Sequence, residues 1–337
     1  MTPDLENRLD LDARPLPRRV REFPFPFPTD SYRYSTNVEA AGAANPTAAG
    51  AWGASVLAVD EFYAGDATEC AELLAADPSR CQELPHMRPA VWDAVFYVLT
   101  QVERARPDDF RLEDLGEDWF RWTNRPLGLQ QSFRYGDDST LPTDPLRWLA
   151  PQVQDDLVLL DQREGALWAD AGVVTAAADW SMKFDVGMSF LEVHGPVPRI
   201  HPERIISRAQ DFLMRLQPGE EYRRTNWTMT VGRRLDVATE TYPEWGPDRR
   251  LVLAQDLGAR LHLRVEVQHL VRLPSSGAVL FLIRTYLLPL RDIALVPQWR
   301  DRLAAVLDEL PEDMADYKGL TRYRHVAADW LRAAGAP

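Results

Sequence analysis

The stretch LHLRVEVQHLVRL, residues 261–273, decides the fold class of this 337-residue chain. Apolar side chains fill most of its odd positions, whereas Arg264, Glu266 and Gln268 fill the even ones, which is the alternation of a β-strand with two unlike faces. PSSG at 274–277 is a turn sequence, and AVLFLIRTYLL at 278–288 has the composition of a second strand. Together they predict an antiparallel hairpin.

A third strand is predicted upstream, in RRTNWTMTVGRRL at 223–235. Its polar residues Arg224, Asn226 and Thr228 share one face, and Trp227 and Met229 share the other. We therefore expect a small, mostly antiparallel sheet that presents a polar row.

Helical spacing is predicted over three segments, 88–107, 144–162 and 201–216. In the second of these Pro151 starts a fresh helix, so Asp155 and Asp156 are expected in an early turn, where carboxylates complement the helix dipole. The third begins near Pro202. This layout predicts an α+β fold with a helical N-terminal half, followed by an antiparallel sheet with flanking helices.

The N-terminal segment, residues 1–39, is expected to be extended because RPLPRRVREFPFPFPTD at 14–30 alternates proline with other residues. Phe23, Phe25 and Phe27 would dock this segment on the body; the alternative is a disordered leader. No linker separates two cores downstream, so residues 40–335 are expected to form a single domain.

Charge and composition narrow the classes of partner. The net charge of −13 argues against a nucleic-acid or anionic-membrane surface, because both need clustered Lys and Arg. The acidic start lacks an apolar signal region, and no run of about 18 apolar residues follows, so we expect a cytoplasmic chain. Cys70 and Cys81 are too few for a disulfide framework or a four-thiolate cluster.

One histidine stands out, in FLEVHGPVP at 190–198. Pro196 and Pro198 exclude a regular helix interior at His194, so its imidazole is expected on a turn. A satisfied structural histidine, a metal ligand and a haem ligand all remain open. Zinc needs three or four ligands, and His194 with His201 offers no such pattern, whereas haem needs one protein imidazole in an apolar cleft.

Four motifs in order resemble the haem-dependent oxidative N-demethylase family, whose founding member is the haem subunit of a dimethylamine-oxidising enzyme. They are FLEVHGPVP, AQDFLMRLQPGEEYRRTNWTM, LRVEVQHLVRLPSSGAVLFLIRTYLLPL and MADYKGL. The resemblance spans about residues 55 to 330. It implies a PAS-like haem b domain over 40–335, His194 as the iron ligand, O2 as co-substrate, an amine substrate, and a separate flavin and iron–sulfur reductase as electron donor.

The polar row of the sheet then supplies the remaining site residues. We expect Arg224 and Glu266 to act in catalysis, the first as a donor to oxygen and the second as a partner for the substrate ammonium, with Asn226 and Arg264 contacting the cofactor. The alternative is that these side chains form cross-strand ion pairs on a solvated face. His201, in RIHP where the family has a small turn, is a rival ligand.

Three function classes follow: a haem monooxygenase that dealkylates or N-oxidises an amine, a haem PAS gas sensor without turnover, and an interaction protein with a structural His194. The sequence leaves open the amine, the natural reductase and whether the chain forms a homo-oligomer.

Overall fold

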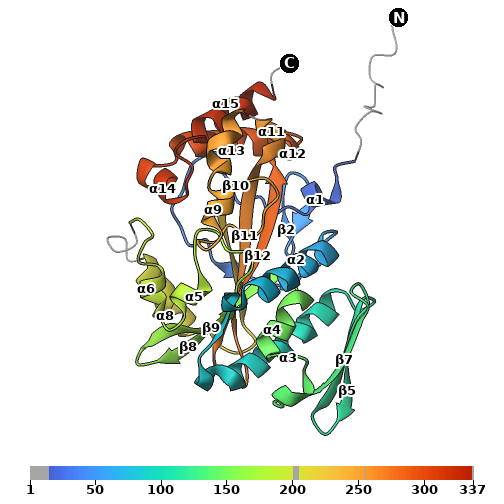
Figure 1. The fold of residues 1–337 in the computed structure, drawn as a ribbon. Coiled ribbons are helices and arrows are strands. Elements are labelled where there is room, and N and C mark those ends of the chain that lie inside the picture. The colour runs from blue at the N-terminus through green and yellow to red at the C-terminus, as the bar shows by residue number, and fades with distance from the viewer. Residues whose placement is uncertain (1–14, 200–204, 255, 336–337) are drawn as a thin grey trace, which may run out of the picture.

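A seven-stranded antiparallel sheet organises the computed structural model, which describes residues 15–199, 205–254 and 256–335 (Figure 1). Within these ranges the strand order is β1-β10-β11-β12-β8-β9-β4. The strands are β1 (Glu39–Ala40), β10 (Glu221–Val231), β11 (Leu261–Arg272), β12 (Val279–Pro289), β8 (Asp155–Arg163), β9 (Ala166–Val173) and β4 (Cys81–Glu83). The predicted hairpin at 274–277 and the predicted third strand are confirmed as β11, β12 and β10.

The prediction of a helix across Asp155 and Asp156 was wrong. The helical part ends earlier, in α4 (Pro145–Leu149) and a short 3-10 turn, and Asp155 begins strand β8. The run DDLVLL is buried on both faces of the sheet, so it lacks the alternation that marks a half-exposed strand. A short, continuous apolar run cannot be told from a buried helix by its period alone.

The N-terminal half is also less helical than predicted. It contains α2 (Tyr63–Ala76) and the expected α3 (Arg88–Ala105), but also a second antiparallel sheet formed by β5 (Phe110–Gly116), β6 (Trp119–Asn124) and β7 (Leu129–Arg134). Strands β4, β8 and β9 of the main sheet come from this half too. The α+β class is confirmed, although helices and strands are interleaved along the chain.

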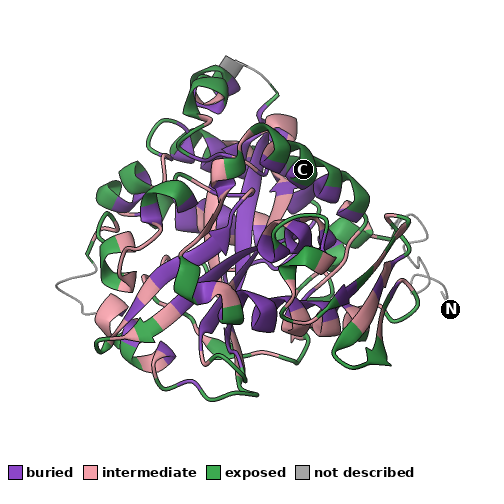
Figure 2. Ribbon diagram, turned by 60° about the horizontal axis from the view of Figure 1, so that its bottom comes forward, coloured by how far each residue is buried: buried purple, intermediate pink, exposed green. Residues whose placement is uncertain are grey.

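The main sheet has two unlike faces, and its central strands β11 and β12 are buried along most of their length (Figure 2). On one face, odd residues of β11 such as Val265 and Val271 contribute to two apolar cores. One core includes α3, α4 and β5–β7, and the other includes the C-terminal helices α13 (Pro297–Glu309), α14 (Glu312–Tyr317) and α15 (Arg324–Ala333). The opposite face carries the predicted polar row and a smaller apolar core.

The helices that cover this polar-row face are short. They are α5 (Met182–Asp185), α6 (Phe190–Val193) and α8 (Ile205–Leu213). The connection after β10 adds α9 (Tyr242–Trp245), α10 (Asp248–Leu251) and α11 (Leu257–Arg260), and α12 (Leu290–Ile293) follows β12. Helix α8 matches the helix predicted after Pro202, which itself lies outside the described residues.

The N-terminal segment packs on the body within its described part. After α1 (Arg18–Arg21), Phe23, Phe25 and Phe27 are all buried, and the Phe25 ring stacks on Trp299 with centroids 4.8 Å apart. The Phe27 ring meets Trp227 of β10 edge-on at 4.9 Å. Two small strands, β2 (Asn45–Pro46) and β3 (Ala51–Trp52), then lead into α2. The division into a leader and one domain stays a prediction.

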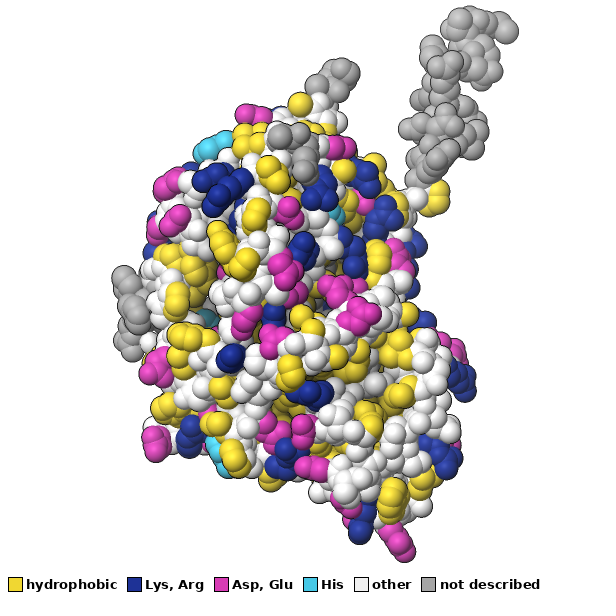
Figure 3. Space-filling model, viewed as in Figure 1, with side chains coloured by type: hydrophobic (Ala, Val, Ile, Leu, Met, Phe, Trp, Pro, Cys, Tyr) yellow, Lys and Arg dark blue, Asp and Glu magenta, His cyan; other side chains and the backbone are white. Residues whose placement is uncertain are grey.

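The surface in view mixes acidic and basic side chains without a large region of one sign (Figure 3). Among the helices of the described ranges, we find none long and apolar enough to cross a lipid bilayer.

Candidate functional site

His194 lies on the turn that ends α6, as predicted. Ser189 and Glu192 form a capping box at the start of this helix, which fixes the one-turn segment that carries the histidine. The imidazole Nδ1 is 2.8 Å from the backbone oxygen of Phe190, and the Phe190 ring lies 4.3 Å from the imidazole ring between centroids. The ring is therefore held in one orientation from its own helix.

The protonation state of His194 suits a ligand. Burial, helped by the positive charge of Arg224, lowers the pKa of His194 to about 4, so the ring is neutral near pH 7. A carbonyl oxygen only accepts hydrogen bonds, so Nδ1 carries the proton and Nε2 keeps its lone pair. Nε2 has no hydrogen-bond partner among the residues described. Metal-bound histidines are characteristically oriented by such a bond from the other ring nitrogen to a backbone carbonyl.

Arg224 contributes a positive charge beside His194, and the negative charge of Glu266 acts on it. Its Nε donates to the backbone oxygen of Thr36 across 3.0 Å, and one terminal nitrogen donates to Gln268 Oε1, also across 3.0 Å. Within the described part of the chain it has no ion-pair partner, and burial lowers its pKa. A partly buried guanidinium whose hydrogen-bond partners are neutral is suited to receive an anionic group of a ligand.

Asn226 and Glu266 are direct cross-strand neighbours in the same polar row. Asn226 Nδ2 is 3.4 Å from Glu266 Oε2, and Gln268 Nε2 donates to the same oxygen across 3.0 Å. The side chain of Glu266 is largely buried. The structure thus brings His194, Arg224, Asn226 and Glu266 to one side of the sheet.

Arg264 has a different environment from the other predicted residues. It is fully buried, and its guanidinium donates to the backbone oxygens of Leu235 and Ala176 and to Thr285 Oγ1. Glu266 Oε1 is 3.4 Å from its Nε. These contacts tie two connecting segments to the sheet. The ion pair with Glu266 lies within β11 and is buried, so it is neither cross-strand nor solvated as the alternative expected. Contact between Arg264 and a cofactor stays a prediction.

Lys318 is a site residue that the sequence reasoning missed. It follows α14, its Nζ donates to the backbone oxygen of Trp227 across 2.6 Å, and burial lowers its pKa to about 8. Its charge interacts with those of Glu266 and Arg224. Lys318 belongs to the MADYKGL motif. No periodicity connects a residue near the C-terminus to β10, so the motif alone does not predict that this lysine reaches the polar row.

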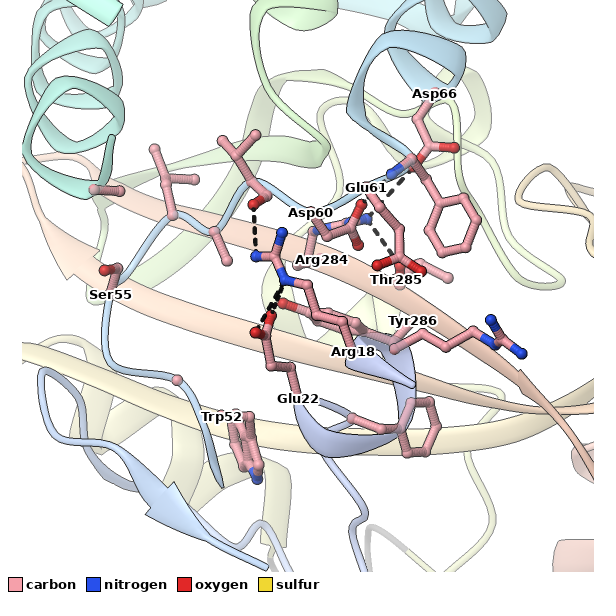
Figure 4. Close-up of a pocket in the computed structure, with 18 of the residues that line it drawn as sticks. Arg18, Glu22, Trp52, Ser55, Asp60, Glu61, Asp66, Arg284, Thr285 and Tyr286 are labelled. Carbon is pink, nitrogen blue, oxygen red and sulfur yellow. Dashed lines mark hydrogen bonds and ion pairs between the residues drawn. The ribbon is translucent and has the colours of Figure 1, made fainter. Parts of the chain in front are cut away.

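A cavity of about 370 Å³ is associated with the opposite face of the main sheet (Figure 4). Arg284 and Asp60 pair across 2.6 Å in its wall, and Tyr286 of the same strand also lines it. None of the described residues around it is a histidine, cysteine or methionine. It therefore offers no side chain of the kinds that usually hold haem iron apart from Tyr286.

His86, Asp161 and Asp170 have metal-ligand spacing, but Arg163 already pairs with both carboxylates. The guanidinium supplies the positive charge there, so the cluster is explained as an ion-pair network around the buried Asp170 carboxylate. His201 lies outside the described residues.

A neutral, oriented imidazole beside a partly buried cation is an arrangement that could hold haem through one histidine. Comparison with known families agrees. Residues 48–328 match the family described as haem-dependent oxidative N-demethylase, alpha subunit-like. The chain belongs to this family, which confirms the resemblance suspected from the four motifs, and the family's description names both haem dependence and an alpha subunit.

Proposed function

We propose that this chain binds haem b through Nε2 of His194, in a PAS-like setting, and oxidises an amine with O2 and electrons from a separate reductase. The observation that carries the proposal is the bond between His194 Nδ1 and the Phe190 carbonyl, which leaves Nε2 with its lone pair beside Arg224. Family membership supports the haem and the oxidative chemistry.

The overall reaction balances as N-demethylation: a methylated amine, O2, two electrons and two protons give the demethylated amine, formaldehyde and water. Haem supplies the activation of oxygen when bound. N-oxygenation of the same amine uses the same oxygen and electrons and is the alternative outcome. Cys70 and Cys81 cannot hold a four-thiolate cluster by themselves, and the alpha-subunit description fits electron delivery by another chain.

The residues of the polar row have separate roles. Arg224 donates hydrogen bonds toward the oxygen, where negative charge builds up during reduction. Glu266 compensates the substrate ammonium, because a cation brought into a buried site costs several kcal/mol without an acceptor. Asn226 orients the Glu266 carboxylate from the facing strand. Lys318, with its lowered pKa, holds a proton close to these groups.

Haem retention after substitution tests the ligand. His194→Ala is expected to lose haem while the chain stays folded, whereas His201→Ala and the surface control His86→Ala are expected to keep it. Haem content and the absorption spectrum of the purified variants give the readout. Loss of haem from the His201 variant with retention in the His194 variant would assign the iron to His201.

A non-catalytic haem gas sensor is the other candidate. Oxygen consumption that depends on both an added amine and an added reductase separates the two, because a sensor binds gas without turnover. A haem-loaded chain that consumes no oxygen across a panel of secondary and tertiary amines favours the sensor.

A further inference from the structure

Lysine is almost absent from this chain. Of its 38 lysine and arginine residues, only Lys183 and Lys318 are lysines. An arginine can replace a lysine as a cation and as a hydrogen-bond donor, but its guanidinium stays charged. A lysine amine, in contrast, can lose its proton and form a covalent bond with a carbonyl carbon. The lysine close to the polar row is therefore a candidate for chemistry that the many arginines of this chain cannot do.

Lys318 is held at both its backbone and its side chain. Its backbone N–H donates to the backbone oxygen of Met314 in α14 across 3.0 Å, and its carbonyl accepts from Thr228 Oγ1 across 3.2 Å. The Nζ donates to the backbone oxygen of Trp227. No carboxylate of the described residues lies within ion-pair distance of Nζ. The residue is half-buried rather than enclosed in an apolar core, so its amine is fixed in place without a counterion.

This environment makes the Lys318 amine more nucleophilic than an ordinary lysine. Burial lowers the pKa of Lys318 to about 8, with the charge of Glu266 opposing the shift and that of Arg224 adding to it. Desolvation and a neighbouring cation are the two means by which proteins activate a lysine amine. The neutral amine donates one N–H to the Trp227 carbonyl and keeps its lone pair, which is then free to attack a carbonyl carbon.

We propose that Lys318 is a capture site for a small aldehyde, namely the formaldehyde that N-demethylation produces. This inference rests on the proposed function for the source of the aldehyde. The amine nitrogen attacks the carbonyl carbon to give a carbinolamine, which loses water to give an imine. A C–N bond forms, the carbonyl oxygen leaves as water with the two hydrogens of the amine, and nothing is oxidised or reduced. Hydrolysis reverses these steps, so the capture holds the reactive product without consuming the lysine.

The first test needs neither haem nor turnover and uses the full chain. Formaldehyde forms imines with amines, sodium cyanoborohydride reduces each imine to a methylamine, and peptide mass spectrometry assigns the methyl group to a residue. At pH 7.5 methylation of Lys318 is expected to be several-fold faster than that of Lys183, which is exposed on α5 and serves as the internal reference. An equal or slower rate at Lys318 would overturn the proposal, because a lysine that only ties α14 to β10 is shielded and protonated.

Two single variants give the matched comparison. Lys318→Arg keeps the positive charge and the donor groups but cannot form an imine, so the fast methylation should disappear. Lys183→Arg makes the same change at the other lysine and should leave the fast methylation unchanged. Circular dichroism compares the fold of both variants with that of the wild type. Fast methylation that persists in Lys318→Arg would assign the reaction to another amine and overturn the proposal.

The second test follows the product during turnover of the haem-loaded chain with an added reductase. The substrate is a methylated amine with carbon-13 in its methyl groups, and the solution contains unlabelled formaldehyde and cyanoborohydride. Direct capture predicts that the labelled share of the new methyl groups is several-fold higher at Lys318 than at Lys183. Equal shares would show that Lys318 meets only dissolved formaldehyde and would overturn its role in holding the product. A loaded chain that oxidises no amine contradicts the proposed function instead, and the methylation rates of the first test then decide whether Lys318 captures aldehydes.

Discussion

Lys318 donates to the backbone oxygen of Trp227 across 2.6 Å, and its ammonium lies 5.0 Å from the centre of the Trp227 ring. This pair joins the C-terminal helices to β10, and Thr228 strengthens the junction by donating to the Lys318 carbonyl across 3.2 Å. The lysine thereby reaches the strand that carries Arg224 and Asn226. The Lys318 ammonium is thus a second positive charge close to the polar row, in addition to Arg224.

Lys318→Met should change the pH dependence of stability. The folded pKa of about 8 lies below the ordinary value of 10.5, so the unfolded chain binds more protons between these values and the wild type gains stability as pH rises through this window. The methionine variant lacks this gain. Urea unfolding of both chains at pH 7.5 and pH 10 measures it, and parallel pH dependence would contradict the lowered pKa.

Arg224→Leu should keep haem but lower turnover by roughly two to three orders of magnitude, the scale for loss of one preorganised donor. Arg224→Lys restores the charge without the forked donors and should recover part of the rate. The exposed Arg215→Leu is the control and should leave the rate unchanged. The measurement is the rate of amine-dependent oxygen consumption of each variant at equal haem content. Full activity in the leucine variant would show that Arg224 has a structural role only.

Glu266→Gln keeps the shape of the side chain and removes its charge. Amine affinity should fall about tenfold, whereas binding of carbon monoxide, a neutral ligand, should stay nearly constant. The exposed Glu244→Gln gives the matched control, since it changes the net charge equally. Equal amine dissociation constants for wild type and Glu266→Gln, measured by spectral titration, would place Glu266 in the ion-pair network of Arg264.

Local patterns predicted the part of the site that lies on regular strands. The alternation in 223–235 and 261–273 placed Arg224, Asn226 and Glu266 on one face, because side-chain direction along a strand has a strict period of two. The prolines around His194 likewise predicted its turn, since backbone restrictions at proline act locally.

The remaining features depend on contacts between distant parts of the chain. Tyr34 and Lys318 lie far apart in the sequence. Tyr34 contacts Pro198, after the His194 turn, and Lys318 contacts Trp227 of β10, because segments distant along the chain pack together. Arg264 shared the alternation of its neighbours, yet its bonds to Leu235 and Ala176 arise from loops whose paths no periodicity describes. The misassigned β8 shows the same limit, because a strand buried on both faces loses its period.

Asp155 at the start of β8 provides the last prediction. Its side chain is 5% exposed, and neither carboxylate oxygen has a hydrogen-bond partner among the described residues. Burial raises its pKa to about 7, although the charge of Arg284 opposes the shift. The folded pKa lies above the unfolded value of 3.8, so this group's stabilisation is fully present below pH 3.8 and is lost as pH rises through about 7.

Asp155→Asn removes the titration and should therefore stabilise the chain more at pH 8 than at pH 5, by a difference of the order of a kcal/mol or more. Asp156→Asn should behave differently, because Asp156 accepts bonds from the backbone nitrogens of Thr175 and Ala176 that an amide satisfies poorly. Denaturant unfolding at both pH values, with the exposed Asp108→Asn as control, measures these differences, and a gain for Asp155→Asn that is equal at pH 5 and pH 8 would refute the raised pKa.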